Sequence, residues 1–368
     1  VWLGGGPTHV ETFDPKPESP VEFRSTVDWV RMVNGKTGAP SFRIGGLWNE
    51  LIKEHRHMNI VRSFTHGNSS HATATHWVMT GHNTRENGNQ QHPGNGSIVS
   101  RRLGTNAPNG MPTYVKYGNI YGDNAAYIGA NYNPFDAAQG KKNLTLGVEA
   151  SRLNDRISLL KSIQQERRHY DNNVVGSYQD QAHGMLLSNL EKAFEPNEKD
   201  KERYGKTKIG DQLIAAKQLT AQGTKFVSVM YGGWDMHGNI KQALDKTAPP
   251  LDLALARLTQ DLVSEGRIDD TLIVVTGEFG RTPKINANAG RDHWGRLNTL
   301  AFIGGDYEGG RVIGKSSKNA EYAEDNPVYP MDVRATIFDH MSIPKDLMYD
   351  DHAGRPQFML PEGNNILA

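Results

Sequence analysis

The stretch DTLIVVTGEFGRTP (residues 270–283) decides the fold class, because a short β-branched and apolar run ends abruptly in a glycine and a carboxylate. Three other apolar runs of similar length are bounded by glycines or polar turns: MNIVRS at 58–63, KFVSVMY at 225–231 and NTLAFIGG at 298–305. Nearly continuous hydrophobicity over such lengths is typical of strands buried on both faces, as in a parallel sheet covered by helices.

Helical patterns lie between these runs. The segment PPLDLALARLTQDLVSEG (249–266) has a proline-led start, apolar residues three to four apart and a terminal glycine. The segment GDQLIAAKQLTAQG (210–223) directly precedes a strand. The order helix, strand, helix, strand, strand over residues 210–304 indicates an α/β sandwich with a mostly parallel central sheet.

The 368 residues are expected to form a single domain, 1–368, that contains an insertion at 104–205. Residues 104–146 are rich in Gly, Asn, Pro and Tyr, and residues 150–203 contain charged amphipathic helices. This loop-rich and helical insertion is either a cap over a functional site or a solvated decoration.

The composition excludes several classes of protein. The 41 Lys and Arg residues balance the 41 Asp and Glu residues, so the chain lacks the basic surface expected of a nucleic-acid-binding protein. No stretch approaches the roughly 18 apolar residues of a membrane-spanning helix. Cysteine is absent, which removes thiolate catalysis, cysteine-type zinc sites and disulfides.

The predicted strands are followed by loops that carry His, Asp or Glu. Because the carboxyl ends of parallel strands share one edge of a sheet, where open α/β sheets bind ligands, we expect a metal site there. Imidazole and carboxylate together suit Zn²⁺, Mn²⁺ or Fe, whereas a ring of oxygen ligands alone would suit Ca²⁺ or Mg²⁺. The number of ions stays open. The candidate ligands are His9, His71, Asp235, His237, Glu278 and His293.

Three histidines, His66, His71 and His76, lie five residues apart. This spacing does not align them on one face of a helix. His71 stands at the predicted start of a helix that ends at Thr80-Gly81, so it is the best placed of the three to face an ion. His76 is expected to be structural.

Several motifs together resemble the domain of unknown function 1501 family: GGGPTHVETFDPKP (4–17), IVRSFTHGNSSHATATHWVMTG (60–81), GGWDMHGN (232–239), VVTGEFGRTPKINANAGRDHWG (274–295) and GRPQFMLPEG (354–363). The resemblance implies a place in the alkaline phosphatase and sulfatase superfamily, with a three-layer α/β/α sandwich. It also implies an exported bacterial protein of a planctomycete-rich family, with a signal, often of twin-arginine type, ahead of Val1. The expected location is therefore periplasmic or extracellular.

The resemblance to the superfamily also implies roles for particular positions. The superfamily's nucleophile falls on His71, and its first metal-binding Asp falls among Gly4, Gly5 and Gly6, with His9 just beyond. Its Asp-His pair falls on Glu278-Phe279, so only the carboxylate is kept. In a similar way, Asp235 with His237 (or Asn239) and the late His293 resemble the other metal site. One metal site would then be largely intact and a second remodelled around His71 and Glu278.

Imidazole is a poor substitute for an alkoxide nucleophile but a good metal ligand, so His71 is expected to bind metal. The expected function is a metal-dependent hydrolase of phosphate or sulfate esters, with sulfated or phosphorylated glycan-type substrates. It would use metal-activated water instead of a Ser, Thr or Cys nucleophile. Arg281 or Arg291 would hold the anionic group. The alternative is a non-catalytic exported binding or scaffold protein with a structural metal, and a homo-oligomer stays open.

Overall fold

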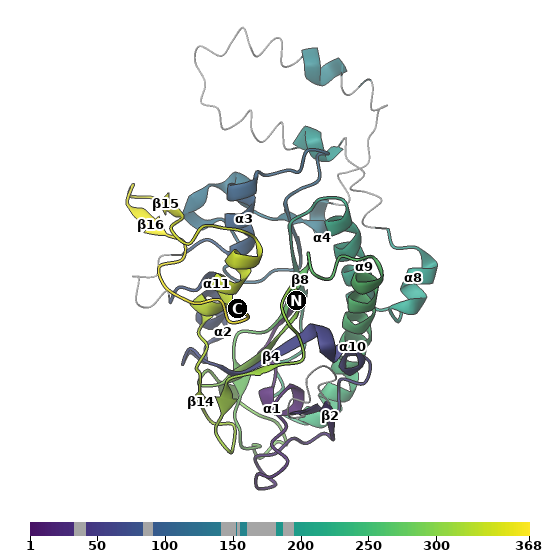
Figure 1. Cartoon of the computed structure of the whole chain (residues 1–368), viewed down its shortest axis with the longest axis vertical. Coiled ribbons are helices and arrows are strands. Elements are labelled where there is room, and N and C mark those ends of the chain that lie inside the picture. Colours follow the sequence, from purple (N-terminus) through teal and green to yellow (C-terminus); the bar gives the residue numbers. More distant parts are fainter. Residues whose placement is uncertain (33–41, 84–90, 141–151, 153–154, 160–181, 187–194) are drawn as a thin grey trace.

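The computed structural model describes residues 1–32, 42–83, 91–140, 152, 155–159, 182–186 and 195–368 (Figure 1). Its centre is a mixed sheet in the order β6-β5-β7-β1-β8-β11-β4-β12. The two halves of this sheet join where the Leu3 N–H donates to the Thr276 carbonyl at 2.8 Å. The strands are β1 (Trp2–Leu3), β4 (Met58–Phe64), β5 (Tyr114–Tyr117), β6 (Phe135–Asp136), β7 (Phe226–Tyr231), β8 (Leu272–Val275), β11 (Asn298–Gly304) and β12 (Val312–Ile313).

Every pairing in this sheet is parallel except those of β11, which runs antiparallel to both β4 and β8. The mostly parallel central sheet expected from the sequence is therefore confirmed. The direction of β11 has a consequence for the site, because its amino end lies at the edge where the parallel strands have their carboxyl ends.

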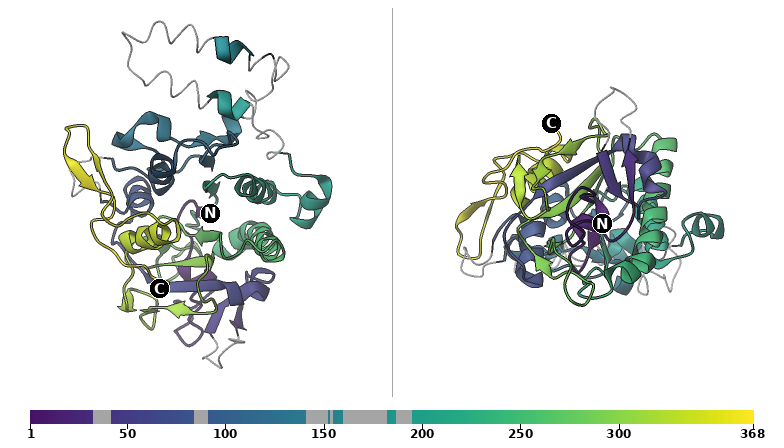
Figure 2. Two further views of the ribbon diagram at one scale, coloured as in Figure 1. Left: turned by 45° about the horizontal axis from the view of Figure 1, so that its top comes forward. Right: turned by 90° about the horizontal axis from the view of Figure 1, so that it is seen from below.

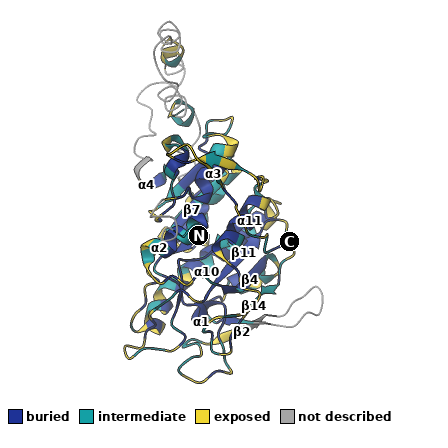
Figure 3. Cartoon of the chain, turned by 90° about the vertical axis from the view of Figure 1, so that its left-hand side faces the viewer, coloured by how far each residue is buried: buried dark blue, intermediate teal, exposed yellow. Residues whose placement is uncertain are grey.

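Helices cover both faces of the sheet, which makes three layers (Figure 2). On one side lie α9 (Lys208–Ala221) and α10 (Ile240–Ser264), and on the other lie α2 (His71–Thr80), α3 (Asn95–Leu103) and α11 (Pro330–His340). Neighbouring strand residues face opposite layers: Ile60 joins the core with α9 and α10, and Val61 joins the core with α2 and α11. The two central strands β4 and β11 are accordingly buried on both faces, whereas β7 and β8 are only partly buried (Figure 3).

Helix α10 begins at Ile240, nine residues before the expected proline-led start, so Pro249 and Pro250 lie inside it. A proline in a helix interior costs about 3 kcal/mol. The buried apolar stripe runs through Ile240, Leu244 and Leu251 on both sides of the prolines, and each such side chain contributes about 1.5–3 kcal/mol on burial. The free energy gained by burying that stripe therefore outweighs the cost of the hydrogen bonds that the two prolines cannot donate.

The expected insertion at 104–205 stays a prediction as a unit, because much of its helical part lies outside the described residues. Its loop-rich part departs from that expectation in one respect. β5 and β6 pair with each other, and β5 also pairs with β7, so this part extends the central sheet. Among the described helices, none is both long and apolar enough to cross a membrane.

Shorter elements surround the sandwich. The helices are α1 (His9–Thr12), η1 (Leu51–His57), η2 (Ala126–Ile128), η3 (Ala130–Tyr132), α4 (Ala137–Gly140) and α8 (Glu198–Arg203), of which the η elements are 3₁₀ helices. The strands are β2 (Trp29–Met32), β3 (Phe42–Gly45), β9 (Gly280–Arg281), β10 (His293–Trp294), β13 (Lys315–Ser316), β14 (Ala323–Asp325), β15 (Met348–Asp350) and β16 (Pro356–Phe358).

Candidate metal centre

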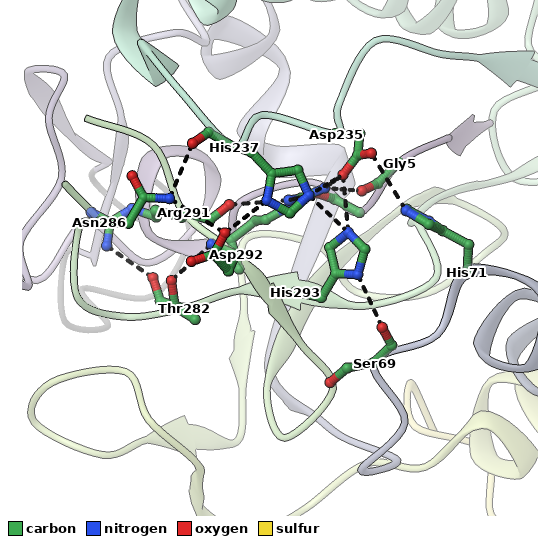
Figure 4. Close-up of polar contacts among 12 residues, drawn as sticks. Gly5, Ser69, His71, Asp235, His237, Thr282, Asn286, Arg291, Asp292 and His293 are labelled. Carbon is green, nitrogen blue, oxygen red and sulfur yellow. Dashed lines mark hydrogen bonds and ion pairs between the residues drawn. The ribbon is translucent and has the colours of Figure 1, made fainter. Parts of the chain in front are cut away.

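Four predicted ligands meet beyond the carboxyl edge of the sheet (Figure 4). Asp235 and His237 belong to the loop after β7, His71 is the first residue of α2, and His293 lies in β10, just before β11. His71, Asp235 and His293 offer ligand atoms that all lie within 4.8 Å of one another. The prediction that strand-end loops converge is therefore correct for these four residues.

The three imidazoles are each held at Nδ1 by an acceptor. His71 Nδ1 lies 2.8 Å from Glu278 Oε1, His237 Nδ1 lies 2.7 Å from Asp292 Oδ1, and His293 Nδ1 lies 3.0 Å from the Ser69 carbonyl oxygen. Carboxylate and carbonyl oxygens only accept hydrogen bonds, so each Nδ1 carries the proton and donates. In a neutral imidazole this leaves the lone pair on Nε2.

The three Nε2 atoms gather around the Asp235 carboxylate. His237 Nε2 and His293 Nε2 each lie 3.0 Å from Asp235 Oδ1 and 3.1 Å from each other, and His71 Nε2 lies 3.5 Å from Asp235 Oδ2. Lone pairs and a carboxylate that face one another repel unless a cation lies between them. Ligands of a tetrahedral zinc ion with bonds of about 2.0–2.1 Å stand about 3.3 Å apart. The spacings of 3.0–3.1 Å among His237 Nε2, His293 Nε2 and Asp235 Oδ1 are close to that value, so these three atoms fit a divalent cation.

Glu278 does not share this position. Its side chain is buried, and Oε1 accepts hydrogen bonds from His71 Nδ1 and from the Gly5 N–H at 2.9 Å. The expectation that Glu278 is a ligand is replaced by a different role: its carboxylate lies behind His71 and orients that ring. Carboxylates that hold a metal-binding histidine in this way fix its tautomer and raise its basicity.

The Arg281 guanidinium is fully buried and has no N–H left for a substrate. Nε donates to the Gly6 carbonyl at 2.9 Å, Nη1 to the Arg291 carbonyl at 3.0 Å, and Nη2 to Asp235 Oδ1 and the Gly5 carbonyl. The fifth donor, on Nη1, points to His237 Nε2 at 3.4 Å. The geometry therefore does not support the expectation that Arg281 binds the anionic group of a substrate.

Arg281 instead acts on the charge of the centre. Burial raises the pKa of Asp235, but the hydrogen bond and the positive charge of Arg281 outweigh burial and lower that pKa below its usual value. Asp235 is therefore ionised at every pH near neutrality and is available as an anionic ligand.

Arg291 and His9 also depart from expectation. The Arg291 side chain is fully buried and pairs with Glu11, also fully buried, at 2.8 Å. His9 is buried as well, with Nε2 donating to the Ala320 carbonyl at 3.0 Å and Nδ1 accepting from the Arg281 N–H at 3.4 Å. Burial lowers the pKa of His9 to about 4. Both residues fix the loops around the centre, and neither reaches it.

Two further histidines support the loops. The His66 ring is buried, its Nδ1 accepts from the Asn68 N–H at 3.2 Å, and its Nε2 donates to the Glu278 carbonyl at 2.6 Å. His76 donates from Nδ1 to the His82 carbonyl at 3.1 Å and accepts at Nε2 from a backbone N–H at 3.1 Å. The structural role expected for His76 agrees with these contacts.

Two parts of the centre were missed in the sequence. Asp292 stands beside His293 in the chain but holds His237 from the neighbouring loop, and its position next to a candidate ligand was the available signal. The Ser69 acceptor is a backbone carbonyl and leaves no sequence signal. Close backbone packing completes the frame, because a Cβ on Gly5 would lie 2.4 Å from the Asp235 nitrogen and Gly5 has a φ of +115°.

Several solved structures are similar to this chain at low identity. Ps i-CgsB in complex with k-i-k-neocarrahexaose has 9% identity and a TM-score of 0.45, over 87% of this chain and 70% of that one. The phosphonate monoester hydrolase SpPMH from Silicibacter pomeroyi has 12% identity and a TM-score of 0.40, over 81% and 69%. The lipoteichoic acid synthase LtaP from Listeria monocytogenes has 10% identity and a TM-score of 0.34, over 100% and 74%.

None of the curated proteins matches the sequence. A family match, in contrast, extends along the whole chain, from residue 1 to residue 368, and its description is "Protein of unknown function (DUF1501)". The motifs that carry the resemblance include the loops that hold Asp235, His237 and His293. The chain belongs to the DUF1501 family.

Proposed function

We propose that this protein is a metal-dependent hydrolase of phosphate or sulfate esters. The observation that carries the proposal is the convergence of three Nε2 atoms on the Asp235 carboxylate, with each Nδ1 held by its own acceptor. Ligand side chains that are 26–48% exposed support access for a small substrate. Zn²⁺ and Mn²⁺ are the ions that best suit three imidazoles and a carboxylate.

A divalent cation in this centre would lower the pKa of a coordinated water from 15.7 to about 7 and polarise an ester oxygen. The residues of the chain supply the frame for that chemistry. Glu278 fixes the His71 ring, and Asp292 fixes the His237 ring. Since Nδ1 is already protonated in both rings, each presents only Nε2 to the centre.

Two of the hydroxyls near His71 make hydrogen bonds that involve the loop between β4 and α2. Ser69 Oγ accepts from the Gly295 N–H at 2.9 Å, and Thr73 Oγ1 donates to Asn68 Oδ1 at 3.1 Å. Both hydroxyls hold the loop between β4 and α2. The proposed substrates are anionic esters, including sulfated or phosphorylated glycans, and the proposed place of action is outside the cytoplasm.

One observation favours a second candidate, a non-catalytic binding protein with a structural metal. Neither Arg281 nor Arg291 has a guanidinium exposed to a substrate anion. The exposure of the ligand side chains argues the other way, because structural metal sites are closed and catalytic sites keep an open position. The hydrolase is therefore the function that the geometry supports better.

The test combines metal content with an ester screen. Wild type, His293→Ala and the control His352→Ala, whose residue is exposed and distant in sequence from the ligands, are compared by plasma mass spectrometry after incubation with Zn²⁺ or Mn²⁺. We expect metal in wild type and in the control, little in His293→Ala, and hydrolysis of an aryl phosphate or sulfate that stops on chelation. Absence of metal in wild type would refute the proposal, and metal without hydrolysis of any ester would favour the binding protein.

A further inference from the structure

The Arg281 guanidinium occupies the space between Asp235 and the loop after β1. We propose that the centre holds one divalent cation and that Arg281 takes the place of a second. This inference rests on the proposed function, because it assumes that the centre binds metal. It also replaces the two-site arrangement expected from the sequence.

The oxygen atoms that could hold a second ion are already engaged by Arg281. The guanidinium contacts the carbonyls of Gly5 and Gly6, the Arg291 carbonyl and Asp235 Oδ1. These are the oxygen donors that a hard cation would need on this side of Asp235. A second ion would have to displace a fully buried side chain that uses all five of its N–H groups.

The sequence of the first loop agrees with this arrangement. The loop after β1 carries Gly4, Gly5 and Gly6 and therefore offers backbone carbonyls but no carboxylate. The planar fork of an arginine suits several carbonyl oxygens at once, whereas a bare ion there would lack an anionic ligand. The glycine carbonyls thus contact the guanidinium of Arg281, and the positive charge at this position comes from a side chain instead of a second metal ion.

The charge balance points to the same number of ions. Three carboxylates contact the imidazole cluster or its rings, those of Asp235, Glu278 and Asp292, and one guanidinium contacts it. With neutral imidazoles the centre has a net charge of minus two. One divalent cation neutralises that charge, whereas two ions with Arg281 displaced would leave a net charge of plus one and repel each other at short range.

Glu278 Oε2 is buried and, within the described structure, has no hydrogen-bond partner. A single oxygen does not hold a second ion, since zinc in proteins takes about four ligands and Mg²⁺ or Ca²⁺ six or more. The unpartnered Glu278 Oε2 therefore does not change the predicted number of metal ions, which is one.

The stoichiometry can be measured on the whole protein. Metal-stripped wild type and Asp235→Ala are dialysed against Zn²⁺, and in a second series against Mn²⁺, and the bound metal is counted by plasma mass spectrometry. The difference between the two proteins gives the number of ions that depend on Asp235 and removes ions bound elsewhere on the surface. We expect one. Two would overturn the inference and leave the proposed function standing, and none would overturn both.

The role of the charge is tested with two variants. Arg281→Met removes the charge, and Arg281→Lys keeps it, with circular dichroism as the check on folding. Since a fixed positive charge opposes cation binding, we expect Arg281→Met to bind Zn²⁺ at least about tenfold more tightly than Arg281→Lys. Equal affinities in two folded variants would contradict the role given to the guanidinium.

Discussion

Replacing the two carboxylates that hold the imidazoles tests the geometry of the centre in a graded way. Glu278→Gln and Asp292→Asn each keep the size of the side chain and an acceptor oxygen for the Nδ1–H group, but remove the negative charge. Loss of such a supporting partner lowers metal affinity by about 10- to 100-fold, or about 1.4–2.7 kcal/mol. Both variants are therefore expected to weaken binding without unfolding the protein.

The structure decides where each variant falls in that range. The Glu278 side chain is 3% exposed, so its charge acts on His71 with little screening. The Asp292 side chain is 55% exposed, so water screens its effect on His237. We expect Glu278→Gln to lower the affinity close to 100-fold and Asp292→Asn close to tenfold.

Zinc affinity is measured by competition with a chromophoric chelator, with circular dichroism to verify folding. Asp245→Asn is the matched control, because it removes an exposed carboxylate that pairs with Lys241 on the surface of α10. Its affinity should equal that of wild type. A change of less than twofold in folded Glu278→Gln, or a larger loss in Asp292→Asn than in Glu278→Gln, would refute the reasoning.

Three other changes test separate parts of the account. Gly290→Ala puts a Cβ 2.1 Å from the His237 backbone in the loop after β7 and should lower the free energy of unfolding by about 1–3 kcal/mol. Gly232→Ala, whose Cβ would meet nothing within 4 Å, should leave it unchanged, and equal melting curves for the two variants would contradict this. Arg291→Met leaves the buried Glu11 carboxylate unpaired and should lower the free energy of unfolding, measured with denaturant, by about 3–5 kcal/mol. The metal content per folded molecule should not change. Loss of metal would argue for a direct role of Arg291 in metal binding. Burial lowers the pKa of His66 to about 4, so between about pH 6.5 and 4 the unfolded chain binds the proton first and the free energy of unfolding falls as pH falls. His66→Gln should lose less of that free energy over the same pH range. An identical slope in the variant would count against the lowered pKa of His66.

The strands and the membership of the cluster could be predicted because they follow from general rules. Continuous apolar runs marked β4, β7, β8 and β11, and loops at the carboxyl edge of a parallel sheet must meet. His71 was identified as a helix start, which is where α2 begins. The same rules therefore predicted that Asp235 and His293 lie close together.

The direction of individual side chains could not be predicted in this way. Glu278 and His9 follow strands as the ligands do, but their loops turn them toward His71 and toward a buried carbonyl. Arg281 or Arg291 was expected to hold an anionic group, but both side chains are buried and pair with carbonyl and carboxylate oxygens. The direction of these side chains depends on the paths of the loops and on the positions of backbone acceptors, which cannot be deduced from the amino-acid sequence.

The central claim is that the four-residue cluster holds a divalent cation, and anomalous diffraction from zinc-loaded crystals at the zinc absorption edge tests it most directly. We expect one strong peak about 2.0–2.2 Å from Nε2 of His237, Nε2 of His293 and an oxygen of Asp235. A map with no peak at that position, from protein that has been shown to be saturated with zinc, would contradict the claim.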